Sequence, residues 1–344
     1  MNKICIIGVY FGKLPAYFEL FLKSCRFNRT IDFYIFTDNV YQKNDDNIFF
    51  VKITLDEMKK RASNYVGFNV ALDKPYKCCD YRPIYGMIFA DFVKNYDYVG
   101  HCDFDVIFGD LQGFFDKYEL YKYDKFLTRG HLSLYRNKPE VWERYSIESG
   151  HENYKDIFTH NRSFVFDEDI ITDIYINNKF PLFKKLIFAD ISPIHHRFRL
   201  IERYPYDNLI SNFDLQVFYW DKGHLFRTYY VDGKFEKDEF LYIHFKRRPN
   251  YIVDFDIKES KSFYIGPEGF SLKCDNVSLE QIKKYNSFPG SKKEKREKDK
   301  YLKEKRRILK KHKRQNNKLY IFFVSKKEIL YIRLRQIYEF IKNK

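Results

Sequence analysis

Residues 96–110 read Tyr-Asp-Tyr-Val-Gly-His-Cys-Asp-Phe-Asp-Val-Ile-Phe-Gly-Asp, an apolar run followed by two carboxylates, Asp103 and Asp105. The i, i+2 spacing places both carboxylates on one side of an extended or turning backbone. Converging carboxylates repel each other, so such a pair indicates a metal, a shared proton or open solvent. Hard oxygen ligands favour Mg²⁺ or Mn²⁺, and two protein ligands leave positions open for phosphate oxygens. The motif therefore predicts a metal and diphosphate site, with a solvated turn as the alternative.

Composition indicates an ordinary globular protein. The 344 residues are 44% hydrophobic, which is enough for one large core or two modest ones. The six cysteines form no C-x-x-C pair, and the start Met1-Asn2-Lys3 leads directly into a strand-like run. A reducing cytoplasm fits these features best. No apolar run approaches the roughly 18 residues needed to span a bilayer.

The net charge of +15 belongs to the C-terminal end of the chain. Residues 291–344 hold 21 Lys and Arg against 6 Asp and Glu, and the rest of the chain is neutral. We therefore expect a catalytic domain over 1–270, a linker over 271–290 and a basic amphipathic helical tail over 291–344.

The tail predicts a contact with an anionic membrane surface. Its basic run, Lys292–Lys318, precedes an apolar helical stripe formed by Ile329, Leu330, Leu334, Ile337, Tyr338 and Ile341. Basic residues near an anionic leaflet contribute up to ~1 kcal/mol each, so the prediction is a peripheral protein on the inner face of the plasma membrane. Nucleic acid is the competing partner, but a neutral core argues against it. A solvated tail or a self-associating helix is the remaining alternative.

The N-terminal residues predict a βαβ unit. A buried strand, Ile4–Tyr10, precedes a helix that starts at Pro15 and a second strand, Ile31–Phe36. This pattern is typical of α/β folds, whose ligands bind beyond the carboxyl ends of the strands. No G-x-G-x-x-G is present, so a dinucleotide fingerprint is excluded. Three residues are candidates to hold a nucleotide or to form turns only: Gly8, Tyr10 and Asp38.

A helix is predicted next, directly before the strand that leads to Asp103. Its apolar stripe follows the i, i+3, i+4, i+7 pattern through Tyr81, Ile84, Tyr85, Ile88, Phe89 and Phe92. Asp80 and Arg82 stand at its start, where a helix N-terminus and a guanidinium can bind phosphate. The alternative is an N-cap and a surface arginine.

Two further segments could line the site. Residues 126–137 alternate as a strand that carries His131, a candidate to bind sugar hydroxyls or a structural histidine. A short strand, Ser163–Phe166, ends at Asp167 and Glu168 before a helical pattern. Acids at a helix start suit the macrodipole, and either of these two could instead be a general base.

The last core strand, Phe240–Arg248, places His244 and Lys246 on one face because the strand period is two. His244 could be a third, softer metal ligand that favours manganese, and Lys246 could bind a phosphate. The pair His195-His196 has no Cys or acid at ligand spacing, so we expect it to be structural.

Taken in order, these motifs resemble a family of bacterial GT-A-type glycosyltransferases from capsule and lipopolysaccharide gene clusters. The resemblance covers about residues 1–270 and rests on Tyr10–Pro15, Thr37-Asp38, Lys77–Pro83, Asp103–Asp110, Gly130–Leu132, Phe166–Glu168 and Ile243–Arg247. It implies a GT-A-like mixed sheet flanked by helices. It also implies Mn²⁺ (or Mg²⁺) held with a nucleotide diphosphate by Asp103, Asp105 and His244. Arg82 stands where a lysine is expected in such relatives.

The expected reaction moves a sugar from a nucleotide-sugar, with UDP as the expected nucleotide, to a growing surface polysaccharide or a lipid-linked glycan. Bond cleavage builds negative charge on the departing diphosphate, which the metal, Lys246 and Arg82 would neutralise. An inverting reaction needs a base, Asp167 or Glu168, whereas a retaining one does not. The rival prediction is a haloacid-dehalogenase-type phosphatase with Asp103 as nucleophile, Asp105 as acid, and Asp167 and Asp169 as magnesium ligands.

Overall fold

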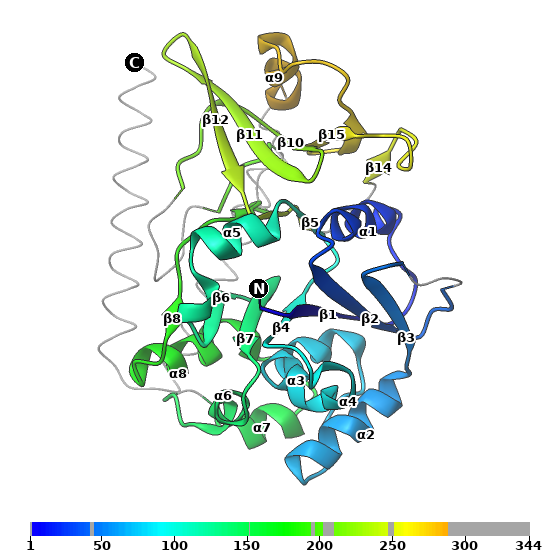
Figure 1. Ribbon diagram of the computed structural model, residues 1–344, viewed down its shortest axis with the longest axis vertical. Coiled ribbons are helices and arrows are strands. Elements are labelled where there is room, and N and C mark those ends of the chain that lie inside the picture. The colour runs from blue at the N-terminus through cyan, green and yellow to red at the C-terminus, as the bar shows by residue number, and fades with distance from the viewer. Residues whose placement is uncertain are drawn as a thin grey trace. The chain divides into compact units, whose positions relative to one another are not determined.

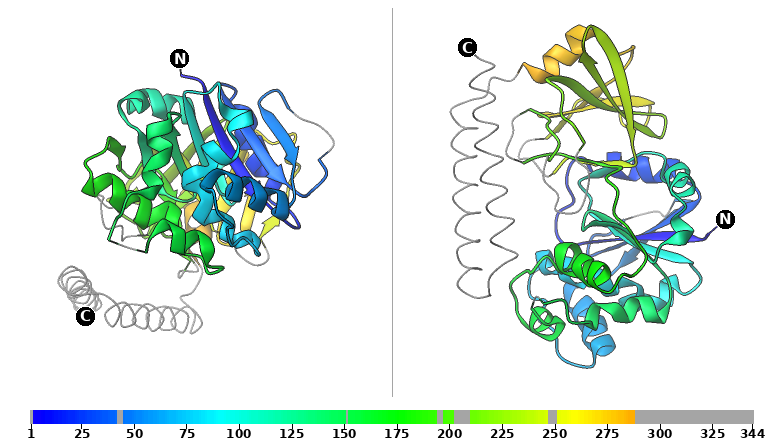
Figure 2. Two further views of the ribbon diagram at one scale, coloured as in Figure 1. Left: turned by 90° about the horizontal axis from the view of Figure 1, so that it is seen from below. Right: turned by 90° about the vertical axis from the view of Figure 1, so that its left-hand side faces the viewer.

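The computed structural model describes residues 2–41, 45–150, 152–193, 197–201, 210–246 and 251–287 (Figures 1 and 2). These residues belong to one compact unit that spans Met1–Pro193 and Arg197–Phe288. The predicted tail over 291–344, the pair His195-His196 and Arg247 lie outside the described residues.

A seven-stranded mixed sheet forms the centre of the N-terminal part. Its strands follow the order β3 (Ile48–Lys52), β2 (Ile31–Thr37), β1 (Ile4–Tyr10), β4 (Tyr98–Cys102), β7 (Leu132–Arg136), β6 (Lys125–Arg129) and β8 (Leu182–Phe183). The first four strands are parallel, β7 is antiparallel to both β4 and β6, and β8 is parallel to β6. The carboxyl ends of β1, β2 and β4 therefore meet at one edge, where a ligand is expected.

Helices cover both faces of this sheet (Figure 1). The core on one face includes side chains of α1 (Phe18–Phe27) and α5 (Leu111–Lys117). The other face packs against α2 (Leu55–Val66), α3 (Tyr85–Ile88), α4 (Ala90–Val93), α6 (Pro139–Trp142), α7 (Tyr154–Thr159) and α8 (Ile171–Asn177). Alternate residues of β1 enter the two cores, as strand geometry requires. The predicted mixed α/β fold is confirmed.

Three predicted elements differ in detail. The first helix begins at Phe18, and Pro15 instead accepts a turn bond from the Phe18 amide at 3.0 Å. The single helix expected after residue 80 is a 3₁₀ helix, η1 (Pro75–Ile84), followed by α3 and α4. Pro83 lies inside this segment and lacks an amide donor, which interrupts the i→i−4 bonding. The predicted apolar stripe is nevertheless buried, apart from the partly buried Phe92.

One predicted strand is two strands in the structure, and another is not a strand. Residues 126–137 form the hairpin of β6 and β7, because the chain turns at Gly130-His131. Residues 163–166 form a loop that enters a π-helix, η4 (Phe166–Ile170). The amides of Phe164 and Phe166 donate to the Asp80 carboxylate at 3.0 and 2.9 Å, so a side chain takes the place of a strand partner.

A three-stranded sheet joins segments that are distant in the sequence. It consists of β5 (Val106–Phe108), β13 (Tyr242–His244) and β9 (Ala189–Asp190). The central strand β13 is antiparallel to β5 and parallel to β9. The register pairs His244 with Val106 on one side and with Asp190 on the other. This small sheet therefore places His244 beside the end of the Asp103-Asp105 turn.

The C-terminal part of the described chain is a six-stranded sheet with one helix. Its strands follow the order β12 (Lys234–Phe240), β11 (His224–Val231), β10 (Leu215–Asp221), β15 (Ser262–Gly266), β16 (Gly269–Leu272) and β14 (Ile252–Val253). The helix α9 (Leu279–Asn286) has a capping box between Ser278 and Gln281, and the side-chain amide of Asn286 donates to the Gln216 carbonyl at 2.8 Å. The described part of the predicted linker, residues 271–287, therefore contains packed secondary structure, because Ile282 is buried against the sheet.

Candidate functional site

The two aspartates lie in the turn between β4 and β5, as the sequence predicts for a strand end. Phe104 between them is buried and stacks on Tyr10, with ring centroids 5.3 Å apart. Burial of Phe104 leaves the flanking side chains on the opposite side, and those of Asp103 and Asp105 are 28% and 19% exposed. Backbone bonds fix the turn, since Asp103 donates to the His131 carbonyl at 3.2 Å.

His244 completes a group of possible metal ligands. Its Nε2 atom lies 3.4 Å from Oδ1 of Asp105. One ligand atom from each of Asp103, Asp105 and His244 lies within 4.8 Å of the other two. The structure thus brings together the three residues that the sequence named as metal ligands.

The residues of this group fit a divalent cation. Two carboxylates and one imidazole are a donor set for Mn²⁺ or Mg²⁺, and the imidazole favours manganese. Burial by itself lowers the pKa of His244, but the carboxylates of Asp105 and Asp190 raise it to about 10. The site therefore stabilises a positive charge at the position where the imidazole nitrogen faces Asp105.

Arg82 links the site to the segment that follows residue 165. Its guanidinium donates to Asp103, to Asp167 at 2.7 Å and to the Gly130 carbonyl at 3.0 Å. A Cβ atom on Gly130 would lie 2.2 Å from Oδ2 of Asp167, so only glycine fits beside this pair. Arg82 is therefore built into the wall of the site and reaches the metal group through Asp103.

The two predicted general bases differ in access. The Asp167 side chain is 1% exposed and bonds Arg82, and burial raises its pKa to about 7 despite that partner. Asp167 lies too deep to accept a proton from an acceptor sugar, so we correct that assignment. The Glu168 side chain is 29% exposed and accepts from the Gly130 amide at 3.3 Å. Glu168 is the accessible carboxylate of the two.

The predicted nucleotide ligands do not all reach the site edge. Tyr10 and Asp38 lie at the ends of β1 and β2, and exposed Asp38 accepts from the Gly12 amide at 2.9 Å. Gly8 is a packing position, because a Cβ atom there would lie 2.3 Å from the Phe104 ring. Asp80 is fully buried and bonds Lys77 at 2.7 Å, so its prediction as a ligand-binding residue is wrong.

Lys246 lies near the metal group, but it does not continue the strand of His244 as the sequence predicts. Its backbone is left-handed with φ 55°, so the strand alternation ends before it. Its Nζ atom nevertheless lies 3.4 Å from Oδ1 of Asp190. Lys246 and His244 are thus joined by one carboxylate.

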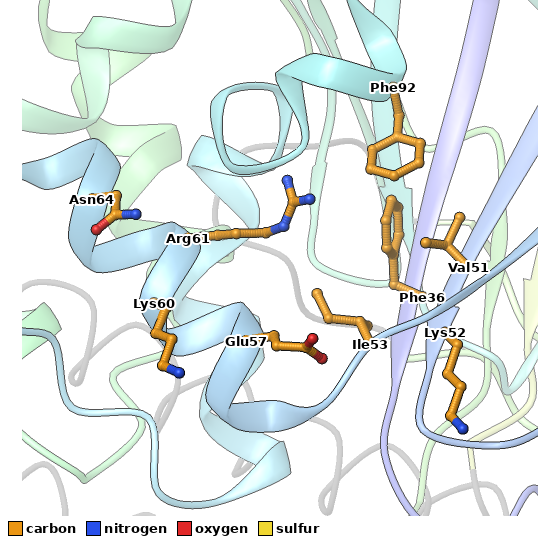
Figure 3. Close-up of a pocket in the computed structure, with 9 residues that line it drawn as sticks. All are labelled: Phe36, Val51, Lys52, Ile53, Glu57, Lys60, Arg61, Asn64 and Phe92. Carbon is orange, nitrogen blue, oxygen red and sulfur yellow. The ribbon is translucent and has the colours of Figure 1, made fainter.

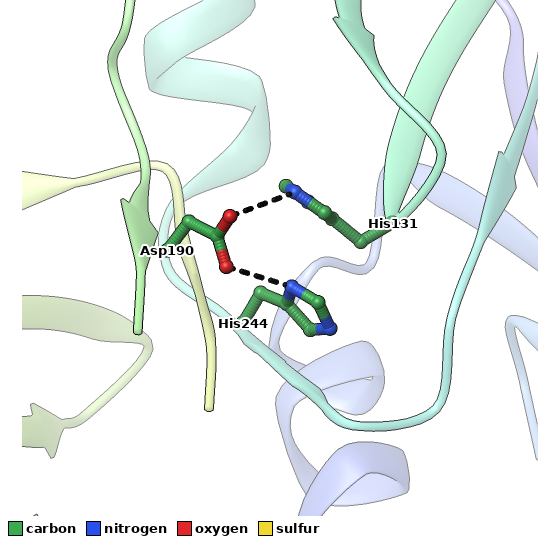
Figure 4. Close-up of side chains that lie close together, drawn as sticks. All are labelled: His131, Asp190 and His244. Atoms are coloured by element: carbon green, nitrogen blue, oxygen red, sulfur yellow. Dashed lines mark hydrogen bonds and ion pairs between the residues drawn. The ribbon is translucent and has the colours of Figure 1, made fainter. Parts of the chain in front are cut away.

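Asp190 was missed in the sequence, whereas His131 is buried and contacts the Tyr242 hydroxyl, which fits the structural alternative for this residue. Figure 4 shows Asp190 between the two imidazoles, 2.9 Å from Nδ1 of His244 and 3.7 Å from Nε2 of His131. These three buried residues also place ligand atoms within 4.8 Å of one another. One signal could have found Asp190: the apolar run Leu186–Ala189 ends in this acid, as the run before Asp103 does.

A surface cavity of about 250 Å³ lies apart from these residues, between α2 and the edge of the sheet (Figure 3). It is lined by Phe36, Val51, Lys52, Ile53, Glu57, Lys60, Arg61, Asn64 and Phe92. None of these residues belongs to the carboxylate and imidazole group.

The chain matches the model of a protein family of unknown function, DUF6625, over residues 6–274. Because the match covers more than half of the chain, the protein belongs to this family. No curated protein matches the chain.

Several solved structures are similar over about half of the chain. The galactosyltransferase LgtC, in complex with donor and acceptor sugar analogues, is 13% identical, with 55% of this chain and 76% of LgtC covered and a TM-score of 0.33. GlyE, a glycosyltransferase of Streptococcus pneumoniae TIGR4, is 15% identical, with 54% of this chain and 45% of GlyE covered and a TM-score of 0.32. Mouse xyloside xylosyltransferase 1 is 9% identical, with 55% of this chain and 87% of the mouse protein covered and a TM-score of 0.37.

Among the described residues, no helix combines the length and apolar character needed to cross a bilayer.

Proposed function

We propose that the protein is a metal-dependent glycosyltransferase. It transfers a sugar from a nucleotide-sugar, which we take to be a UDP-sugar, to a growing surface polysaccharide or a lipid-linked glycan. The observation that carries this proposal is the convergence of Asp103, Asp105 and His244, where β4 of the mixed sheet ends beside β5 and β13 of the three-stranded sheet. A nucleoside diphosphate is the leaving group that such a site suits, because its charge needs both a cation and basic side chains.

Each residue of the site has a role in this proposal. Asp103, Asp105 and His244 would hold Mn²⁺ or Mg²⁺, and the cation would supply Lewis-acid stabilisation of the diphosphate. Lys246, whose side chain is 27% exposed, adds a point charge for a phosphate. Arg82 holds Asp103 in place. Glu168 is the base if the reaction inverts the anomeric centre.

The nucleotide would lie along the carboxyl ends of β1 and β2. Asp38 is exposed there and can accept bonds from a base or a ribose. The partly buried Tyr10 ring, which stacks on Phe104, borders the same edge. Gly8 supports this arrangement through its packing against Phe104.

The phosphatase alternative gains no support. It needs Asp167 and Asp169 to join Asp103 and Asp105 around one magnesium ion. Within the described residues, the acidic groups that converge on Asp103 and Asp105 include neither of them. Asp167 bonds Arg82 instead, and Asp169 lies 3.1 Å from Arg129.

Residues 291–344 are the segment that we propose binds the protein to a membrane surface. Their net charge of +15 would hold the protein on an anionic inner leaflet, near a lipid-linked acceptor. Flotation with phosphatidylglycerol-containing liposomes, with and without these residues, tests this point. Equal flotation of both forms would contradict it.

Nucleotide-sugar hydrolysis in the presence of Mn²⁺ tests the transferase itself. We expect turnover of one UDP-sugar from a panel, its loss with EDTA, and a decrease of at least about tenfold in Asp105→Asn. The matched control is Asp124→Asn, since Asp124 is another largely buried carboxylate, paired with Arg136 and Arg144 away from the site. Hydrolysis that is unchanged in Asp105→Asn would refute the assigned site.

A further inference from the structure

Asp190 is the cross-strand neighbour of His244 in the three-stranded sheet. The parallel register of β9 and β13 pairs the two residues, and the Ile191 amide donates to the His244 carbonyl at 2.9 Å. Both side chains are thus carried on backbones that are bonded to each other. Oδ1 of Asp190 lies 2.9 Å from Nδ1 of His244, which is hydrogen-bond distance.

This contact fixes which imidazole nitrogen carries the proton. A carboxylate accepts only, so Nδ1 of His244 must be the donor to Asp190. The other nitrogen, Nε2, faces Asp105 at 3.4 Å, on the side of the metal group. An imidazole that donates through Nδ1 presents the lone pair of Nε2 when it is neutral, which is the form that binds a metal.

Two other groups of the site lie close to Asp190. Lys246 lies 3.4 Å from Oδ1, the oxygen that accepts from His244. His131 lies 3.7 Å from Oδ2 and contacts the Tyr242 hydroxyl at 2.7 Å through Nδ1. One buried carboxylate therefore bonds the third metal ligand, His244, and lies close to the basic side chain of Lys246.

A second metal ion between Asp190 and the two histidines is the competing explanation. The imidazoles stack with centroids 4.3 Å apart and planes 28° apart, an arrangement that packs the rings face to face. An ion there would also have to replace the short bond between His244 and Asp190. The geometry favours the hydrogen bond.

We propose that Asp190 is a positioning residue that sets the tautomer and orientation of His244 and so tunes the affinity of the Asp103, Asp105 and His244 group for its cation. This inference rests on the proposed function, because it needs a metal at that group. Partners of this kind change metal affinity by about 10- to 100-fold when they are removed.

Mn²⁺ binding, followed by the loss of the free Mn²⁺ electron paramagnetic resonance signal, tests the proposal without any substrate. We expect the full chain to bind one Mn²⁺, Asp190→Asn to bind it about 10- to 100-fold more weakly, and Asp124→Asn to bind it within twofold of the wild type. Circular dichroism of each variant reports whether the fold is kept.

The outcomes separate the two proposals. Failure of the wild type to bind Mn²⁺ would remove the metal site and the proposed function with it. Wild-type binding with an unchanged Asp190→Asn, an equal loss in Asp124→Asn, or two ions per chain would overturn only the role of Asp190.

A second measurement tests the proposal even if the Asp190→Asn variant does not fold. The wild-type protein, labelled with ¹⁵N-histidine and loaded with the diamagnetic ion Mg²⁺, gives long-range ¹H–¹⁵N spectra that identify the protonated ring nitrogen. The resonance of His244 is assigned by its absence in His244→Gln. A proton on Nδ1 is expected, and a proton on Nε2 with none on Nδ1 would overturn the proposal.

Discussion

Replacement of Arg82 by methionine should destabilise the protein through Asp167. Arg82 is the donor to the Asp167 carboxylate at 2.7 Å, and Asp167 has a side chain that is only 1% exposed. Methionine keeps most of the side-chain volume but removes the charge. The buried carboxylate then loses its counter-ion, while Asp103 remains partly solvated.

The burial of Asp167 determines how much of the free energy of unfolding Arg82→Met should lose. Removal of one partner from a buried ion pair costs about 3–5 kcal/mol, whereas the more exposed contact with Asp103 adds about 1 kcal/mol or less. Asp167 escapes part of this cost by taking up a proton, because burial already raises its pKa to about 7. We expect a loss of about 3 kcal/mol at pH 8 and a smaller loss at pH 6.

The sign of the pH dependence is fixed by the raised pKa. An acid whose pKa is raised in the folded state favours folding when protonated, so stability falls as pH rises from about 4 towards the folded pKa. In the wild type this fall levels off above about pH 7, the pKa of Asp167. Without Arg82 the pKa of Asp167 is higher still, so the deficit of Arg82→Met should widen by up to about 1.4 kcal/mol per pH unit above pH 7.

Urea unfolding between pH 6 and 9 in EDTA measures these free energies. Arg61→Met is the matched control, because Arg61 pairs with Asp91 at 2.9 Å with both side chains more than one third exposed. That exposed pair should contribute about 0–1 kcal/mol. Asp167→Asn added to Arg82→Met should recover at least about 1 kcal/mol. The reasoning is refuted if Arg82→Met loses no more than Arg61→Met, or if its deficit is the same at pH 6 and pH 8.

Three further predictions concern the site. Gly8→Ala should cost about 1–3 kcal/mol in urea unfolding, because the added Cβ lies 2.3 Å from the Phe104 ring; an unchanged midpoint would contradict this packing. Mn²⁺ affinity should rise about tenfold per pH unit between pH 6 and 8, because His244, with a pKa of about 10, must release a proton when the metal binds. Calorimetry in buffers of different ionisation enthalpy measures the number of protons released per Mn²⁺ bound, and binding without proton release would contradict this prediction. Lys246→Ala should weaken UDP binding about tenfold or more but change Mn²⁺ binding little, and equal losses in both would count against a phosphate contact.

The sequence by itself determined the local chemistry of the site. Phe104 is apolar and must be buried, so the alternation of side chains exposes Asp103 and Asp105 on the other side. The same periodicity identifies β1 and β2 and the buried stripe before β4, because each depends only on neighbouring residues. These elements could be predicted since local backbone geometry decides them.

Only the tertiary structure decided how the acids are used. Asp167 and Glu168 are adjacent in the sequence, but one packs behind Arg82 and the other remains accessible. Asp190 reaches His244 only through the pairing of β9 with β13, and no periodicity records such a pairing between distant segments. Long-range strand register and burial depth depend on the whole fold, which is why single residues could be named from the sequence while their partners could not.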